Sequence, residues 1–169
     1  MIYVFVEGKT DDIFISKLFN EKLLIDNYLV VQYSTKKSKE IKNYINTIKQ
    51  IDNSEYIFLA DQDGNVDKKN VIMSKYPFLD KDKVFISIYE IESWIISGLS
   101  IKLSQKYKIR QINLNTSKIT KEIFDNLVPS SMSKLEFILY VLDDFDILQA
   151  IKYNESFKIF YEYIKKRAS

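Results

Sequence analysis

Acidic side chains at the ends of three short apolar segments are the groups in this sequence best suited to chemistry. They are Glu7, Asp11, Asp61, Asp63, Glu90 and Glu92. Carboxylate oxygens are the ligands that Mg²⁺ and Mn²⁺ prefer in proteins. Because like charges gathered at one place repel each other, either their pKa values rise or a cation lies among them. The sequence therefore predicts a site for one or two divalent cations, Mg²⁺ or Mn²⁺.

The absence of other reactive side chains narrows the chemistry. The 169 residues include no cysteine and no histidine, which excludes thiolate nucleophiles, imidazole bases and zinc–thiolate sites. Carboxylates, lysines, hydroxyl groups and oxygen-bound cations remain for any catalysis. Two such cations roughly 3.5–4 Å apart can hold a phosphodiester group for in-line displacement. Phosphodiester hydrolysis is the reaction that fits these residues.

The segments that carry these acids alternate between strand patterns and helix patterns. Four apolar runs have the composition of buried strands, namely residues 2–6, 28–33, 56–60 and 84–88. Helical patterns cover residues 10–22 and 38–51 between them. This alternation predicts a Rossmann-like α/β fold, with about four mainly parallel strands flanked by helices. Since ligands bind at the carboxyl ends of the strands in such a sheet, we expect the acids to meet at that edge.

Glycine and capping positions add local detail. Gly8 and Gly64 directly follow acids of the predicted site, where glycine allows a sharp turn and the close approach of a ligand. Thr10 is expected to cap the first helix. Gly98 is expected to end a helix that contains Trp94, and Trp94 is expected to lie in the core.

Strand patterns stop after residue 92, and helical patterns continue. They cover residues 94–99, 117–126, 133–151 and 157–164. We therefore expect an α/β domain over residues 1–100, followed by a helical C-terminal extension over residues 101–169 that packs on it.

The order of these motifs resembles the Toprim domain of topoisomerases, primases and several nucleases. The resemblance rests on Glu7-Gly8-x-x-Asp11 after one strand and on Asp61-x-Asp63 after a later strand. The stretch Glu-Ile-Glu-Ser-Trp at residues 90–94, with helices after it, is most like small stand-alone Toprim proteins related to the overcoming-lysogenisation-defect (OLD-like) nucleases. The resemblance covers roughly residues 1–100.

The resemblance implies a metal-dependent nuclease that uses two-metal-type catalysis. Its site residues carry over as Glu7, Asp11, Asp61 and Asp63 for catalysis and metal binding, Glu90 and Glu92 as further metal ligands, and Lys134 as a catalytic basic residue. DNA is the favoured substrate over RNA. A role in phage defence or in nucleic-acid processing is the corresponding biological expectation.

Basic residues near the start of the chain are the expected contacts for nucleic acid. Lys9, Lys36 and Lys37 are predicted to bind phosphates, although the last two also fit the solvated start of a helix. The formal net charge is only +2. Together with the small size, this charge suggests a homodimer, or a partner protein that completes the substrate groove.

Two other functions fit parts of the sequence. The segment around residues 56–66 resembles the first motif of haloacid-dehalogenase-like phosphatases, in which Asp61 is the nucleophile and Asp63 the acid/base, with Asp143 and Asp144 as a downstream acid pair. A non-catalytic Toprim module that binds nucleic acid or a partner protein is the third possibility.

The sequence also predicts where the protein works. The first apolar run ends at Glu7, so it is too short for a signal peptide. No apolar run approaches the roughly 20 residues of a membrane span. We therefore expect a cytoplasmic protein with no membrane partner.

Overall fold

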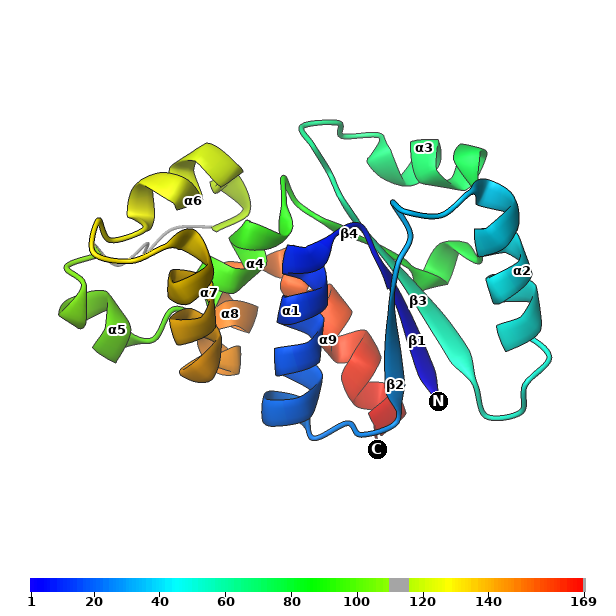
Figure 1. Cartoon of the computed structure of the whole chain (residues 1–169), viewed down its shortest axis with the longest axis horizontal. Helices are drawn as coiled ribbons and strands as arrows, with labels where there is room; N and C mark the ends of the chain where they lie inside the picture. Colours follow the sequence, from blue (N-terminus) through cyan, green and yellow to red (C-terminus); the bar gives the residue numbers. More distant parts are fainter. Residues whose placement is uncertain (110–115, 169) are drawn as a thin grey trace. The chain divides into compact units, whose positions relative to one another are not determined.

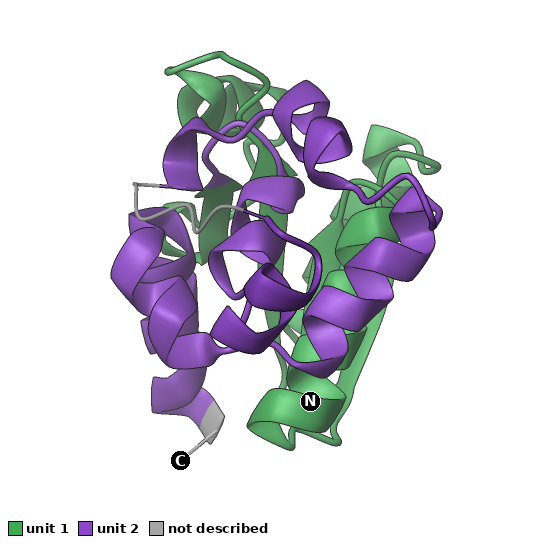
Figure 2. Cartoon of the chain, turned by 90° about the vertical axis from the view of Figure 1, so that its left-hand side faces the viewer, with its two compact units in different colours: residues 1–86 green, residues 87–169 purple. Residues whose placement is uncertain are grey.

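The computed structural model describes residues 1–109 and 116–168, which belong to two compact units. Unit 1 comprises Met1–Ile86 and unit 2 comprises Ser87–Ser169 (Figure 2). Residues 110–115 of the expected C-terminal extension lie outside the described residues. The units divide before the expected boundary at residue 100, because helix α4 (Ile91–Ser97) packs against three helices of unit 2.

Unit 1 is built on a parallel β-sheet, as the sequence predicts. Its strands are β1 (Ile2–Val6), β2 (Tyr28–Gln32), β3 (Glu55–Asp61) and β4 (Val84–Ser87). They form a four-stranded, all-parallel sheet in the order β2-β1-β3-β4 (Figure 1). In register, Val6 lies beside Gln32 and Phe5 beside Phe58. The chain therefore has the expected Rossmann-like α/β architecture.

Helices cover both faces of this sheet. They are α1 (Lys9–Lys17), which continues as a π-helix over Leu18–Leu23, then α2 (Ser38–Ile48), α3 (Lys68–Lys75) and a 3₁₀ turn at Lys81–Lys83. Figure 1 shows α1 on one side of the strands and α2 with α3 on the other. The isoleucines of α2 are buried because their helical spacing aligns them on one face, where they pack on Phe5 and Phe58.

The first helix is capped two residues earlier than expected, so the prediction that Thr10 caps it is wrong. Gly8 is the N-cap residue, and its N–H donates a hydrogen bond to the Asp11 carboxylate at 3.1 Å. This contact uses the acid three residues into the helix to satisfy a backbone donor at the helix start. Thr10 therefore lies inside the first turn.

Unit 2 is entirely helical over its described residues beyond β4. Besides α4, it contains α5 (Ile101–Lys106), a 3₁₀ turn at Thr116–Lys118, α6 (Lys121–Leu127), α7 (Lys134–Asp143), α8 (Ile147–Tyr153) and α9 (Glu155–Ala168). Trp94 is buried among Phe157 and Phe160, and its indole N–H donates to Ser156 Oγ at 2.7 Å. Trp94 is thus a core residue, as expected.

Two turns shape this helical unit. Gly98 ends α4 as predicted, and a side chain is excluded there because a Cβ atom would lie 2.2 Å from the Phe145 ring. The long helix expected over residues 133–151 is instead two helices, because Asp146 caps a new helix by accepting a hydrogen bond from the N–H of Gln149. Among the described residues, no helix has the length and apolar character needed to cross a bilayer.

Candidate functional site

Glu7 is fixed where strands β1 and β2 end. The Tyr33 hydroxyl donates a hydrogen bond to Glu7 Oε2 at 3.2 Å. The Tyr33 N–H donates to the carbonyl of Val6 at 2.8 Å, which continues the parallel pairing one residue beyond β2. The Ser34 hydroxyl donates to the Glu7 carbonyl. The parallel register therefore sets both the backbone and the carboxyl group of Glu7.

Asp11 lies in the first turn of α1, next to the end of β1. Its side chain is only 4% exposed, and its carboxylate accepts the N–H of Gly8. Gly8 has a φ of −143°, an extended conformation that any residue adopts, and a Cβ atom there would be 3.6 Å from Asp11 Oδ2. The turn after Glu7 therefore does not need glycine for its backbone angles, contrary to expectation.

Asp61 and Asp63 differ in their surroundings. Asp61 is the last residue of β3 and is half-buried. Asp63 lies in the following turn, where Asp63 and Gly64 have φ values of 51° and 71°; this left-handed backbone explains Gly64. The Asp63 carboxylate is exposed and ion-paired with Lys68 of α3. Lys68 therefore already neutralises one of the predicted metal ligands.

The pKa of the Tyr33 hydroxyl is affected by several acids of unit 1. Burial raises the pKa of its hydroxyl well above the usual value, and the charge of Glu7 and the hydrogen bond to it raise it further, as do the charges of Asp11 and Asp61. These carboxylates come from β1, α1 and β3, far apart in the sequence. Their shared effect on one hydroxyl indicates a negative potential at the carboxyl end of the sheet.

The acids of unit 1 form a loose group. Within residues 1–109 and 116–168, no three acidic side chains are close enough, in their present rotamers, to hold one ion. The donor set still fits a hard divalent cation, because Glu7, Asp11 and Asp61 supply only oxygen ligands and already act together on Tyr33.

Tyr33 is the residue of this group that the sequence interpretation missed. Its aromatic ring stacks on Phe58 at a centroid distance of 4.4 Å, so it is anchored in the core of unit 1. The available signal was the register: Val6 pairs with Gln32, so the next residues, Glu7 and Tyr33, lie side by side. That pairing requires the sheet order, which the sequence alone does not give.

Unit 2 has its own cluster of the predicted site residues. Glu92 is 5% exposed and ion-paired with Lys134 Nζ at 2.9 Å, and the same amine contacts Asp125 at 2.8 Å. Burial alone would lower the pKa of Lys134, but its hydrogen bonds to Asp125 and Glu92 and their charges outweigh that effect and raise it. Lys134 is therefore a firmly charged partner of two acids.

Glu90 lies at the N-cap of α4. Burial, and then the negative charge of Glu92, raise the pKa of its carboxyl group. Among the described residues, Glu90 Oε2 is buried without a hydrogen-bond partner. The backbone and the charge of Lys121 act in the opposite direction and lower this pKa, but they do not outweigh the burial.

The predicted nucleic-acid contacts lie on unit 1. Lys9 is exposed at the start of α1 and Lys37 is exposed at the N-cap of α2. Lys36 is half-buried, with its amine 5.5 Å from the centroid of the Tyr44 ring. The acid pair of the phosphatase alternative lies in unit 2, where Asp143 ends α7 and Asp144 accepts a hydrogen bond from Ser100 at 2.7 Å.

Comparison of the chain with models of protein families, with curated proteins and with solved structures finds no significant match in any of the three.

Proposed function

We propose that the protein is a divalent-cation-dependent nuclease of the Toprim type. The observation that carries the proposal is the placement of three acids at the carboxyl end of the sheet, with Glu7 directly after β1, Asp11 in the first turn of α1 and Asp61 at the end of β3. Asp11 has a structural role at the start of α1, but Glu7 and Asp61 bring two further acids to the same end of the sheet, where like charges repel each other. A bound cation would offset the repulsion between these acids.

The proposed roles follow from the contacts of each residue. Glu7, Asp11 and Asp61 would hold the cation, Mg²⁺ or Mn²⁺, and Asp63 would be a ligand of a second ion. Such a cation, when bound, would supply Lewis-acid chemistry for the hydrolysis of a phosphodiester. Tyr33 orients the Glu7 carboxylate through its hydrogen bond. The N–H of Gly8 does the same for Asp11.

Lys68 gives unit 1 a cation that the sequence interpretation did not name. Its ion pair with Asp63 keeps a positive charge at the turn that follows β3. We infer that Lys68 attracts the phosphate backbone of the substrate when Asp63 turns toward a bound ion. Lys9, Lys36 and Lys37 are proposed as further phosphate contacts, with DNA favoured over RNA.

The assignment of Glu90, Glu92 and Lys134 to the same chemistry stays a prediction from the family resemblance. So do a role in phage defence and a cytoplasmic location. Lys134 also contacts Asp125, which gives this lysine a structural role. The Glu92→Gln variant distinguishes that structural role from a catalytic one.

A metal-dependent cleavage assay tests the proposal. Plasmid DNA, single-stranded DNA and RNA are incubated with Mn²⁺ and with the wild type, Glu7→Gln or Asp61→Asn, and Asp52→Asn, an exposed acid outside the group, is the matched control. We expect cleavage by the wild type and the control only. Hydrolysis of small phosphomonoesters with phosphorylation of Asp61 would instead identify the phosphatase. Binding without cleavage would identify the non-catalytic module.

A further inference from the structure

Strand β2 has an open edge. It is the first strand in the sheet order, with β1 on one side, and no described strand pairs with its other side. The Ile2 N–H donates to the Asn27 carbonyl, and the Tyr33 N–H donates to the Val6 carbonyl. Since backbone groups of successive residues point in opposite directions along a strand, those of Tyr28, Val30 and Gln32 point to the open edge.

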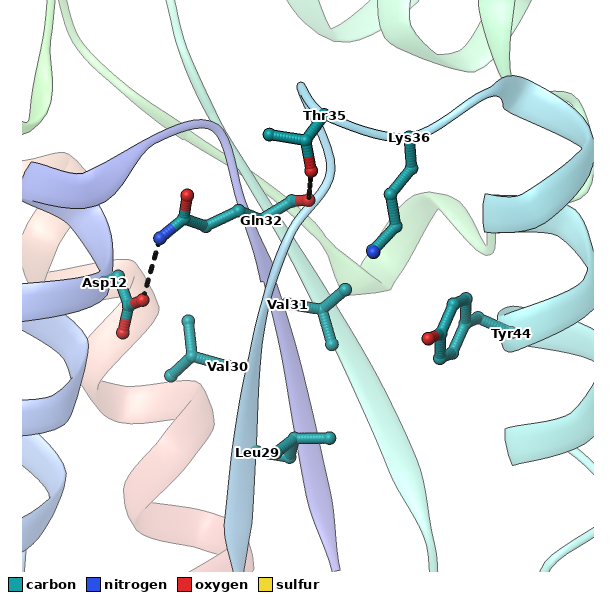
Figure 3. Close-up of a pocket in the computed structure, with 8 residues that line it drawn as sticks. All are labelled: Asp12, Leu29, Val30, Val31, Gln32, Thr35, Lys36 and Tyr44. Atoms are coloured by element: carbon teal, nitrogen blue, oxygen red, sulfur yellow. Dashed lines mark hydrogen bonds between the residues drawn. The ribbon is translucent and has the colours of Figure 1, made fainter.

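A hollow of about 340 Å³ follows this edge. Figure 3 shows Asp12 on one side of β2 and Lys36 with Tyr44 on the other, with the strand between them. The carbonyl of Gln32 accepts a hydrogen bond from the Thr35 hydroxyl at 3.1 Å, which marks one end of the open stretch. The flanking helices therefore leave the middle of the edge, around Val30, accessible to another backbone.

The sequence of β2 lacks the features that protect open edges. Such strands usually carry a charge, a proline or a bulge that prevents pairing with another chain. β2 reads Tyr-Leu-Val-Val-Gln, with neither charge nor proline. Leu29 is 45% exposed. An apolar, regular edge of this kind is a template for a further strand.

Charges at the two ends of β2 indicate what that strand is. The exposed Asp26 lies just before β2, and Lys36 and Lys37 lie just after it. A second copy of β2 in antiparallel orientation brings the acidic end of each copy to the basic end of the other. A parallel copy would bring like charges together. The edge is therefore self-complementary, as a two-fold interface requires.

We propose that β2 pairs antiparallel with β2 of a second copy of this chain, with the two-fold axis at Val30. In that register Val30 faces the second copy's Val30, Tyr28 faces its Gln32, and Leu29 faces its Val31. The outward backbone groups of Tyr28 and Val30 then gain partners, and Leu29 loses its exposure. The two sheets become one continuous sheet. This proposal does not require the proposed nuclease activity, and it places Lys36 and Lys37 beside the interface as well as among the proposed phosphate contacts.

A single introduced cysteine tests the register, because the native chain has none. Val30→Cys places two sulfurs across the axis, where hydrogen-bonded antiparallel residues have Cα atoms about 5.5 Å apart, within the range of a disulfide. Val66→Cys, at a residue that is 89% exposed in a loop, is the control. We expect the first variant to form a disulfide-linked dimer at least about tenfold faster than the second.

Two separate lysine substitutions, one inside the proposed interface and one outside it, test how strongly the two copies bind without disturbing the core. Leu29→Lys places a charge in the proposed interface, and two-fold symmetry places it there twice. Leu148→Lys makes the same change at a residue that is 79% exposed on α8. Sedimentation velocity should show a dimer for the wild type and for Leu148→Lys, with the dimer Kd at least about tenfold higher for Leu29→Lys. Circular dichroism checks that all variants are folded.

Several outcomes would overturn the proposal. They are a wild type that stays monomeric, a dimer that Leu29→Lys does not weaken, and equal crosslinking of both cysteine variants. A further outcome is a protein that stays monomeric, with its Val30 N–H protected from hydrogen exchange only after an extended peptide of another protein is added. That result would assign the edge to a different partner. If the pure protein protects the Val30 N–H and this protection is lost on dilution, the result supports the dimer.

Discussion

The acids of the two units are held in different ways. In unit 1, Glu7 accepts a hydrogen bond from the neutral Tyr33 hydroxyl and Asp11 accepts one from the N–H of Gly8. In unit 2, Glu92 shares the charged amine of Lys134 with Asp125. Neutral donors orient a carboxylate without cancelling its charge, whereas an ammonium group cancels it. Unit 1 also holds the Asp63–Lys68 ion pair, so the difference is between individual residues: Glu7 is oriented by a neutral hydroxyl, whereas Glu92 is paired with an ammonium group.

The largest expected effect is the loss of metal-dependent cleavage when the unit 1 acids are neutralised. Glu7→Gln and Asp61→Asn should each reduce the rate by about 10²-fold or more, a size typical for groups that stabilise charge in the transition state. Their folded states should be about as stable as the wild type, because each substitution keeps the size and shape of the side chain. Initial rates with Mn²⁺ and thermal unfolding without it measure the two effects.

The second-largest expected effect is a loss of stability when the Glu92 cluster of unit 2 is changed. Glu92→Gln leaves Lys134 with Asp125 alone, so we expect the free energy of unfolding to fall by about 1–3 kcal/mol. Asp125→Asn, on the exposed end of the same pair, should cost less than about 1 kcal/mol. Urea unfolding of both variants provides the measurement.

The Glu92→Gln variant also tests whether Glu92 is a structural residue or a metal ligand. If Glu92→Gln abolishes cleavage while its unfolding curve matches that of the wild type, then Glu92 acts as a metal ligand, as the family resemblance implies. Its ion pair with Lys134 would then be part of the catalytic machinery rather than a device for stability.

A smaller effect on the rate is expected for Tyr33→Phe. The change removes the hydrogen bond to Glu7 and keeps the ring on Phe58. Since one hydrogen bond contributes about 1 kcal/mol, the cleavage rate should fall by about fivefold, with a matching loss of Mn²⁺ affinity. Tyr44→Phe, which keeps the ring beside Lys36, is the matched control and should leave both quantities unchanged.

The smallest effect concerns Glu90, the acid of unit 2 whose pKa is raised by burial and by the charge of Glu92. A raised pKa means that the folded state binds a proton more tightly than the unfolded state, so the charged carboxyl lowers stability at neutral pH. Glu90→Gln should therefore stabilise the protein at pH 7, by less than about 1 kcal/mol because the group is only half-buried.

The sign of this effect can be followed with pH. As the pH falls through the raised pKa of Glu90, the wild type becomes protonated and its disadvantage relative to Glu90→Gln disappears. Urea unfolding of both proteins from pH 7 to pH 4 should thus give converging curves. A difference that stays constant over this range would show that the charge of Glu90 is not the cause.

Much of the fold followed from the sequence because its signals are local. The apolar runs predicted the strands of the described residues to within about one residue. The isoleucine spacing also predicted the buried face of α2, but that helix ends at Ile48 rather than at residue 51, and Ile51 is exposed. Helices α3 and α5 were missed because neither has a clear apolar stripe. The break between α7 and α8 was missed because Asp146 acts as a cap only once the chain turns there.

The site was predictable in composition and less so in detail. The positions of Glu7, Asp11 and Asp61 follow from the rule that ligands bind at the carboxyl ends of parallel strands. The partners of the acids do not follow, because Tyr33 reaches Glu7 through the sheet order and Asp125 reaches Lys134 through the packing of helices. Tertiary contacts of this kind leave no local pattern in the sequence.

The most direct test of the central claim is the position of Mn²⁺ in crystals of the protein, located by its anomalous scattering. The account predicts a peak in unit 1 with carboxylate oxygens of Glu7 and Asp61 among its ligands, and the loss of that peak in Glu7→Gln crystals. A manganese ion that binds without contact to either residue, or that persists unchanged in the variant, would contradict it.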